Sequence, residues 1–258
     1  MKNAVSRLFR LRKPLDGCKL AIITGCGHTG TTLLARMMGV HSKIYNPPYE
    51  TNIFLAYNVL KWEKLLKLQF SNAKKNKREC SILLEKTPRH IWHVDYINRI
   101  VPGVKVILMT RNGRDVVASL YERTGDIDSS ILRYKDDSFL TIRQLNNQSS
   151  LLIRYEDLIA NSSFELTRIM NHIGLEFEES MLNYHETDVN WYNQESVERG
   201  GPRDEGEEHL KLRNWQVNQP IFSQSKKWNE RIPKKHWSKL DSFFEDDGDE
   251  IMKNLGYF

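Results

Sequence analysis

A glycine-rich segment between an apolar run and a helix-forming run constrains this chain more than any other feature. It reads GCGHTGTT over residues 25–32, directly after the apolar residues Leu20–Thr24. Glycines allow positive φ and close approach of the backbone, so successive N–H groups can surround an anion at the start of a helix. We therefore expect a strand over Leu20–Thr24, a phosphate-binding loop, and a helix from about Thr31 to Met38.

The loop departs from the common nucleotide-triphosphatase signature at one position. Its spacing matches G-x-x-x-x-G-K-[ST], but Thr31 stands where that signature has lysine. The lysine neutralises the β- and γ-phosphates, which a threonine does not do. An ordinary ATPase and a plain structural turn remain alternatives, and a loop that serves a less charged nucleotide is favoured over both.

Strand-forming and helix-forming runs alternate along the rest of the chain. Strands are predicted at 81–85, 104–109 and 151–154, and helices at about 51–70, 89–100, 114–123, 163–173, 234–244 and 249–255. Residues 74–78 and 188–225 are predicted to form loops. Such alternation is typical of parallel β-α-β units with right-handed crossovers. We therefore expect an α/β chain with a P-loop-type three-layer fold, in which helices flank a central parallel sheet.

Length and composition favour one water-soluble domain. The chain has 258 residues, of which 40% are hydrophobic and 28% charged, enough for a sizeable core beneath a polar surface. No repeat or linker divides it, so residues 1–258 are predicted to form a single domain, with 1–18 as a peripheral N-terminal segment. No apolar run approaches the roughly 18 residues of a membrane span, and the basic N-terminus lacks the apolar core of a signal peptide.

Cysteine content and charge indicate the cellular compartment and the kind of partner. Cys18, Cys26 and Cys80 show no metal-ligand spacing, and their odd number argues against a disulfide framework, so a reducing, cytoplasmic location is expected. The formal net charge of +5 favours anionic partners, although a solvated basic surface is equally consistent with it. No recognised nucleic-acid-binding motif accompanies that charge, so no nucleic-acid partner is expected.

A second segment has the features of a phosphate site. Residues 104–123 read VKVILMTRNGRDVVASLYER, a strand followed by a turn and a helix. Arg111 lies just beyond the carboxyl end of the strand, the edge at which open α/β sheets bind ligands. Asp115, Ser119 and Arg123 follow at i+4 spacing, and a guanidinium and a hydroxyl arranged this way can hold a phosphate. Taken alone, the segment is also consistent with an ordinary surface helix.

The combination of the two segments is more specific than either part. GCGHTGTTLL followed by ILMTRNGRDVVASL resembles the PAPS-dependent sulfotransferase family, whose donor is 3′-phosphoadenosine 5′-phosphosulfate (PAPS) and whose nucleotide product is adenosine 3′,5′-bisphosphate (PAP). The resemblance implies that Arg111 and Ser119 hold the 3′-phosphate, the group that separates this donor from ATP. It implies that the first loop holds the 5′-phosphosulfate through Gly27, His28, Thr29, Gly30, Thr31 and Thr32.

Further blocks extend the resemblance to about two thirds of the chain. Residues 85–88 (EKTP) are similar to an element of carbohydrate sulfotransferases, and residues 152–158 (LIRYEDL) to the element after the 3′-phosphate helix. Residues 216–220 and 226–228 are similar to the loop that covers the nucleotide in tyrosylprotein sulfotransferases and their bacterial relatives. These similarities imply donor contacts from Arg123, Tyr155 and Lys227. Residues 125–148 and 185–212 match no element of the family.

Three residues are candidates for the chemistry. The family usually has Lys or Arg at the position of His28, where the side chain stabilises the leaving oxygen. A protonated imidazole, or one hydrogen bond from a neutral imidazole, would serve there, and Lys86 is a second candidate for the positive charge. Glu50 resembles the family's catalytic glutamate and is the candidate general base. The helix dipole alone would also favour a glutamate at the start of a helix.

Other side chains have weaker arguments. His41, His90 and His93 compete for the role of base, and His90 and His93 are otherwise a surface pair. Aromatic side chains that would stack on adenine or sugar, or pack in the core, are Trp191, Tyr192, Trp215 and Trp228. No HxxxH or Cys/His set supports a metal site. No metal is expected, because this donor has no polyphosphate chain for a metal to clamp.

These observations predict a sulfotransferase that moves a sulfuryl group from PAPS to an acceptor hydroxyl by in-line displacement. The acceptor would be a saccharide, a glycolipid or a peptide tyrosine. A P-loop nucleotide-dependent kinase is the alternative enzyme, against which the missing lysine at position 31 argues. A non-catalytic module that binds the nucleotide or RNA is the alternative outside enzymes. The sequence leaves the acceptor and the oligomeric state open.

Overall fold

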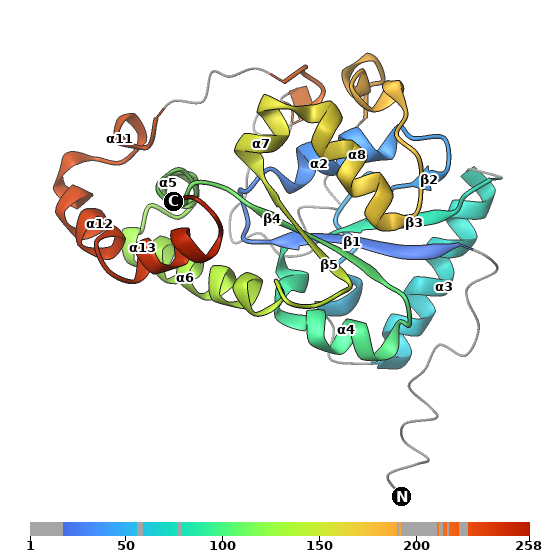
Figure 1. The fold of residues 1–258 in the computed structure, drawn as a ribbon, viewed down its shortest axis with the longest axis horizontal. Helices are drawn as coiled ribbons and strands as arrows, with labels where there is room; N and C mark the ends of the chain where they lie inside the picture. Colours follow the sequence, from blue (N-terminus) through green and yellow to red (C-terminus); the bar gives the residue numbers. More distant parts are fainter. Residues whose placement is uncertain are drawn as a thin grey trace, which may run out of the picture.

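Five parallel strands form one sheet in the order β2-β3-β1-β4-β5 (Figure 1). The computed structural model describes residues 18–55, 59–76, 79–189, 191, 211, 214–215, 217–221 and 227–258. The strands are β1 (Lys19–Gly25), β2 (Ile44–Tyr45), β3 (Ile82–Lys86), β4 (Lys105–Thr110) and β5 (Ser150–Arg154). The central parallel sheet predicted from the alternation of strands and helices is therefore confirmed.

Helices lie on both faces of this sheet and beyond one edge of it. The α-helices are α2 (Thr31–Gly39), α3 (Val59–Asn76), α4 (Val94–Ile100), α5 (Gly113–Thr124), α6 (Ile127–Arg143), α7 (Tyr155–Ala160), α8 (Ser162–Ile173), α11 (Trp228–Arg231), α12 (Trp237–Phe244) and α13 (Asp247–Asn254). Short 3₁₀ turns are η1 (Ile53–Leu55), η2 (Pro88–His93), η3 (Glu179–Met181), η4 (Tyr184–Glu186) and η5 (Lys234–His236).

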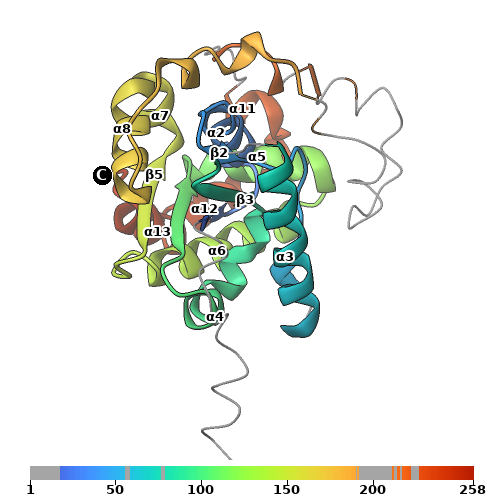
Figure 2. The same ribbon diagram turned by 90° about the vertical axis from the view of Figure 1, so that its right-hand side faces the viewer.

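Alternate residues of the central strand pack into two separate hydrophobic cores. Ala21 and Ile23 of β1 pack with α2 and α8, whereas Leu20 and Ile22 pack with α3 and α4 on the other face. The view in Figure 2 shows α2 and α8 on one side of the strands and α3 and α4 on the other. Because both faces of the sheet are covered, its strands are apolar almost throughout, as expected for a buried parallel sheet.

A third core lies near the carboxyl ends of the strands, where α5 and α6 pack with α12 and α13 and with Cys26 after β1 (Figure 1). Helix α6 was missed by the sequence analysis, which left residues 125–148 unassigned. Asp126 caps it, since its side chain accepts hydrogen bonds from the backbone N–H groups of Asp128 and Ser129. The signal for this helix was therefore a capping aspartate followed by an amphipathic run.

The predicted helix over 51–70 is displaced toward the C-terminus. Residues Thr51 and Asn52 are not helical, Asn52 has a φ of 53°, and Ile53–Leu55 form the 3₁₀ turn η1. Helix α3 continues to Asn76, so Lys74 and Lys75 belong to its last turn and the loop predicted there is wrong. Lysines suit the C-terminal end of a helix because its dipole favours positive charge.

The remaining boundaries mostly agree with the sequence. The helix predicted over 89–100 begins as the 3₁₀ turn η2 and continues as α4, and the short helix α7 was not predicted. The predicted loop over 188–225 lies largely outside the described residues, and residues 1–17 lie wholly outside them. Within the described part of the chain, no helix is both long and apolar enough to cross a membrane.

The carboxyl ends of four strands meet along one edge of the sheet. Strand β1 ends at Gly25, β3 at Lys86, β4 at Thr110 and β5 at Arg154. Each of the four ends at a residue predicted to belong to a site or within two residues of one. The topology therefore gathers these residues at the edge where open α/β sheets bind ligands.

Candidate active site

The phosphate loop joins β1 to α2 with two left-handed residues. Gly30 has a φ of 88° and is the N-cap of α2, and His28 has a φ of 69° although it carries a side chain. The hydroxyl of Thr29 donates to the carbonyl of Cys26 at 2.8 Å and so closes the loop on itself. No side chain caps the start of α2, where Thr31 is the first helical residue. The positive end of the helix dipole therefore faces the loop unopposed.

Tyr155 packs directly against this loop. A Cβ atom built on Gly30 would lie 2.5 Å from Cδ2 of Tyr155, so only glycine fits at that position. Tyr155 begins α7, immediately after β5 ends. On its ring lies the guanidinium of Arg111, whose Cζ atom is 4.6 Å from the ring centroid. Three predicted donor residues from three elements are thus in one stack.

Arg111 has an unmet hydrogen-bonding need. Its side chain is 12% exposed, and Nη2 lies 4.0 Å from the Asp115 carboxylate. The Nε atom is buried and has no hydrogen-bond partner among the described residues. A buried guanidinium N–H without an acceptor is costly, and an anionic ligand would supply the acceptor. The chemistry of this residue fits the 3′-phosphate that the sequence resemblance assigned to it.

The two predicted phosphate sites are in direct contact. Ser119 is on α5, two turns after the end of β4, and its Oγ atom lies 2.8 Å from Nδ1 of His28 in the phosphate loop. The tautomer of the imidazole decides which of the two atoms donates the proton. The residue expected at the 5′-phosphosulfate and the residue expected at the 3′-phosphate therefore lie on adjoining walls of one site.

Arg123 and Lys227 lie at the exposed rim near α5. Arg123 is in the last turn of α5, one turn beyond Ser119. Lys227 directly precedes α11, and α11 is held on α5 by the ion pair of Arg231 with Glu122, in which Nε lies 2.9 Å from Oε1. The fold thus brings the C-terminal part of the chain beside the 3′-phosphate helix. Donor contacts from Arg123 and Lys227 remain predictions.

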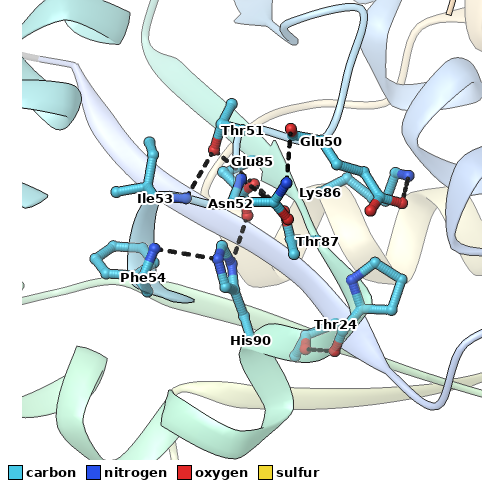
Figure 3. A network of polar contacts seen from close by, with 11 residues as sticks. Thr24, Glu50, Thr51, Asn52, Ile53, Phe54, Glu85, Lys86, Thr87 and His90 are labelled. Atoms are coloured by element: carbon cyan, nitrogen blue, oxygen red, sulfur yellow. Dashed lines mark hydrogen bonds and ion pairs between the residues drawn. The ribbon is translucent and has the colours of Figure 1, made fainter. Parts of the chain in front are cut away.

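The two catalytic candidates outside the phosphate loop are paired. Figure 3 shows Nζ of Lys86, the last residue of β3, bonded to Oε1 of Glu50 at 2.6 Å. The Lys86 side chain is fully buried, whereas that of Glu50 is 41% exposed. The Lys86 ammonium also lies 5.0 Å from the centroid of the Trp191 ring, which is buried. A fixed cation and an accessible carboxylate therefore meet at the carboxyl end of β3.

The competing histidines are engaged elsewhere. His90 is fully buried, with Nδ1 2.7 Å from Oε2 of Glu85, so the prediction of a surface pair with His93 is wrong. Burial and the neighbouring His90 lower the pKa of His93, which is half-buried. The Nε2 atom of His41 lies 3.0 Å from the carbonyl of Glu176. Glu50 is the candidate base whose carboxylate is both accessible and next to Lys86.

The other aromatic candidates have mixed environments. Trp191 packs in the core against Lys86, Trp228 lies beneath the guanidinium of Arg114, and Trp215 is 55% exposed. Tyr192 lies outside the described residues. None of these contacts distinguishes a stacking role from packing.

One residue beside the phosphate loop was missed from the sequence. A Cβ atom at Gly27 would lie 2.9 Å from Nη2 of Arg133, which belongs to the unpredicted helix α6. The Nε atom of Arg133 lies 3.5 Å from Oδ2 of Asp137, whose Oδ1 accepts a 2.7 Å hydrogen bond from Trp92. Burial raises the pKa of Asp137 despite these partners. No family motif pointed to Arg133, so only the three-dimensional arrangement reveals this cation.

The described residues contain no cluster of three or more His, Cys, Asp or Glu side chains arranged to hold a metal ion. The three cysteines are thiols, and Cys18 and Cys80 are neighbours whose sulfur atoms lie 3.1 Å apart at the start of β1 and before β3. Neither cysteine is near the carboxyl edge of the sheet. The candidate site described above thus contains cations, hydroxyls and the carboxylates of Glu50 and Asp115.

Known proteins share parts of this sequence. Residues 58–179 match the model of a family described as the sulfotransferase family. A Caenorhabditis briggsae protein named "Putative protein-tyrosine sulfotransferase" is 32% identical over 114 residues, which cover 40% of this chain and 41% of the relative. The chain thus aligns with about two fifths of that relative's length.

Solved structures share the fold across most of the chain. A mouse sulfotransferase, SULT7A1, solved in complex with PAP, superposes with a TM-score of 0.56 at 13% identity and covers 99% of this chain and 92% of its own. A sulfotransferase from Alicyclobacillus acidocaldarius gives a TM-score of 0.54 at 13% identity, covering 91% and 94%. Residues 58–179 are thus similar to the sulfotransferase family, and the chain shares the fold of these two solved sulfotransferases.

Proposed function

We propose that this chain is a PAPS-dependent sulfotransferase that transfers a sulfuryl group to an acceptor hydroxyl. The observation that carries the proposal is the contact between the two phosphate sites, with His28 on one and Ser119 on the other. The buried, unpartnered Nε atom of Arg111 supports it, because a 3′-phosphate would provide the missing acceptor. A nucleotide with phosphate groups on both its 3′ and 5′ positions suits two such neighbouring sites.

Each part of the proposed reaction is assigned to different residues of the chain. PAPS supplies the activated sulfuryl group when it binds. The start of α2 and the phosphate loop would hold its 5′-phosphosulfate, and His28 with Lys86 would stabilise charge on the leaving oxygen. Glu50 would accept the proton of the acceptor hydroxyl. Glu50 is suited to this role because its carboxylate is accessible while Lys86 fixes its position.

We further propose that the reaction needs no metal, since Arg111, Lys86 and the phosphate loop would supply the positive groups at the proposed phosphate positions. Among hydroxyl acceptors, a peptide tyrosine is the first choice, on the basis of the name carried by the C. briggsae relative. A single domain is consistent with the continuous sheet. The cytoplasm remains the proposed location, supported by the three cysteine thiols.

Calorimetry tests the donor assignment. We expect PAP to bind without magnesium about ten- to a hundredfold more tightly than 5′-AMP, because losing a charge-assisted phosphate contact costs about 1.5–3 kcal/mol. ATP and a short RNA are compared in the same series. Equal affinity for PAP and 5′-AMP would contradict the assignment. Preference for ATP with magnesium would favour a kinase, and preference for RNA a nucleic-acid-binding module.

A transfer assay then tests the activity. ³⁵S-labelled PAPS is incubated with an acidic tyrosine-containing peptide, with the same peptide carrying phenylalanine in place of tyrosine, and with a panel of saccharides and glycolipids. We expect label on the tyrosine peptide and none on its phenylalanine counterpart. Label on a saccharide or glycolipid alone would keep the sulfotransferase and replace the acceptor. Label on no acceptor, with PAP bound, would argue for a non-catalytic nucleotide-binding module.

A further inference from the structure

Two consecutive residues of β3 hold two consecutive residues of the segment that carries the candidate base. Lys86 binds the carboxylate of Glu50 at 2.6 Å, and the carboxylate of Glu85 accepts a 2.8 Å hydrogen bond from the hydroxyl of Thr51. Successive side chains of a strand point to opposite faces of the sheet. Strand β3 therefore contacts the segment from both faces of the sheet, through Lys86 on one face and Glu85 on the other.

Glu85 is the centre of a buried polar cluster (Figure 3). Its side chain is 1% exposed. The Oε1 atom accepts from the hydroxyls of Thr51 and of Thr87, the latter at 2.6 Å, and Oε2 lies 2.7 Å from Nδ1 of His90. Burial raises the pKa of Glu85, but His90 and the two hydroxyls outweigh it and hold that pKa below its ordinary value. Oε1 is thus hydrogen-bonded twice inside the protein, and Oε2 is in ion-pair contact with His90.

His90 extends the cluster to the backbone of the same segment. Its Nε2 atom accepts a hydrogen bond from the N–H of Phe54 at 3.3 Å. Since Nε2 accepts, Nδ1 carries the proton that faces Glu85. The ring therefore joins Glu85 on one side to residue 54 on the other, and the ring itself is fully buried.

Most hydrogen bonds of the segment after Glu50 involve side chains of this cluster. The N–H of Asn52 donates to the Thr87 hydroxyl at 3.3 Å, and the N–H of Ile53 to the Thr51 hydroxyl at 3.4 Å. Residues 51 and 52 belong to no helix or strand, and Asn52 has a φ of 53°. Side chains of the β3–η2 region thus replace the regular backbone bonds that this segment lacks.

We propose that Glu85 and His90 are positioning residues that set Glu50 against Lys86 for catalysis, acting through Thr51 and the backbone of residues 52–54. The inference rests on the proposed function, in which Glu50 is the general base. A base must lie within hydrogen-bond reach of the proton that it accepts, and a displacement of about 1 Å can cost 10²-fold in rate. Lys86 binds only the carboxylate of Glu50, whereas Glu85 and His90 hold the residues that follow it.

Thr51 offers a sharp test because its variants keep their shape. Thr51→Val removes the hydroxyl that donates to Glu85 but keeps the β-branched volume, whereas Thr51→Ser keeps the hydroxyl. The control is Thr141→Val on α6, which removes another buried threonine hydroxyl, bonded to the carbonyl of Asp137 at 2.9 Å. Three kinds of measurement are made on each variant. They are kcat and KM for the tyrosine peptide with labelled PAPS, the Kd of PAP, and hydrogen exchange at the amides of Ile53 and Phe54.

For Thr51→Val we expect kcat to fall by about tenfold or more, an unchanged Kd for PAP, and faster exchange at both amides. Thr51→Ser should restore both kcat and the exchange rates, and Thr141→Val should change neither. Normal kcat and normal exchange in Thr51→Val would overturn the proposal, as would an equal loss of kcat in Thr141→Val. If wild type transfers nothing from PAPS, the proposed function fails. The exchange rates then decide separately whether Glu85 holds the segment.

Discussion

The Nδ1 atom of His28 and the Oγ atom of Ser119 lie 2.8 Å apart, across the boundary between the phosphate loop and the helix that follows β4. One atom pair thus connects two segments that are more than eighty residues apart in the sequence. Because a hydroxyl can rotate toward another acceptor, Ser119 can bind a phosphate and still stay within reach of His28. Under the proposed function, this hydrogen bond would couple the two phosphate sites.

His28→Lys should make turnover less dependent on pH. An imidazole changes charge near neutral pH, whereas a lysine ammonium keeps its charge throughout the range from 6 to 8. We expect kcat of wild type to vary across that range and kcat of His28→Lys to stay flat. His28→Ala should bind PAP but turn over at least tenfold more slowly, in the manner of a lost charge-stabilising donor. Identical pH profiles for wild type and His28→Lys would exclude His28 from the chemical step.

Arg111→Ala should weaken PAP binding by about ten- to a hundredfold, the value of a charge-assisted phosphate contact. Arg111→Lys should recover only part of that loss, because a point charge lacks the bidentate geometry of a guanidinium. The matched control is Arg168→Ala on α8, where the guanidinium binds Glu165 on the same helix. Calorimetry with thermal unfolding checks both variants. An unfolded Arg111→Ala protein would mean that Arg111 is structural.

Glu50→Gln should lower kcat by about 10²–10⁴ while the Kd of PAP stays the same, since a general base acts on the acceptor and not on the nucleotide. Glu63→Gln on α3 is the control, because Glu63 is likewise paired with a lysine, Lys67, at 2.6 Å. Steady-state kinetics with the tyrosine peptide make the comparison. Normal turnover in Glu50→Gln would transfer the role of base to another residue and leave the donor site unaffected.

Gly30→Ala should abolish PAP binding. The added Cβ atom would lie 2.5 Å from Cδ2 of Tyr155, at a residue whose φ is 88°. Gly103→Ala is the matched control, since Gly103 also has a positive φ, 76°, but its Cβ would meet nothing within 4 Å. We expect Gly103→Ala to cost about 1–2 kcal/mol of stability, the penalty for a left-handed alanine, and to bind PAP normally. Loss of PAP binding in both variants would show that backbone strain alone explains the result.

Glu85 should contribute to acid unfolding. Its pKa is lowered in the folded protein by His90 and two hydroxyls acting against burial. Its stabilisation is therefore complete above the unfolded pKa of about 4.3 and is lost as the pH falls through the lower, folded pKa. We expect the urea-unfolding free energy of wild type to fall more steeply between pH 5 and pH 3 than that of Glu85→Gln. Parallel slopes would mean that Glu85 does not titrate with unfolding.

Local patterns predicted the sheet well, and they located the candidate donor residues, because both depend on short continuous segments. Residues 104–123 and residues 20–38 each contain the end of a strand, a turn and the start of a helix within some twenty residues. The parallel topology then fixes where those ends meet. Arg111, Ser119 and His28 could be placed together in advance for this reason, and their contacts follow the expected arrangement.

The parts that sequence reasoning missed depend on contacts between distant segments. The residues on either side of His90 in the sequence are typical of the protein surface. His90 is a core residue only because the Phe54 backbone and Glu85 pack around it. Arg133 carries no motif, and its closeness to Gly27 follows from how α6 packs under β1. The helix predicted from residue 51 failed for a related reason, since tertiary hydrogen bonds outweigh helix propensity there.

The contacts of β3 with residues 50 and 51 also give the two proposed catalytic side chains a common support. Lys86 and Glu85 are consecutive residues of one strand that has a hydrogen-bonded neighbour on each side. Lys86 pairs directly with Glu50, and Glu85 holds the residue after it, so the proposed base and its cation depend on the same two positions of β3.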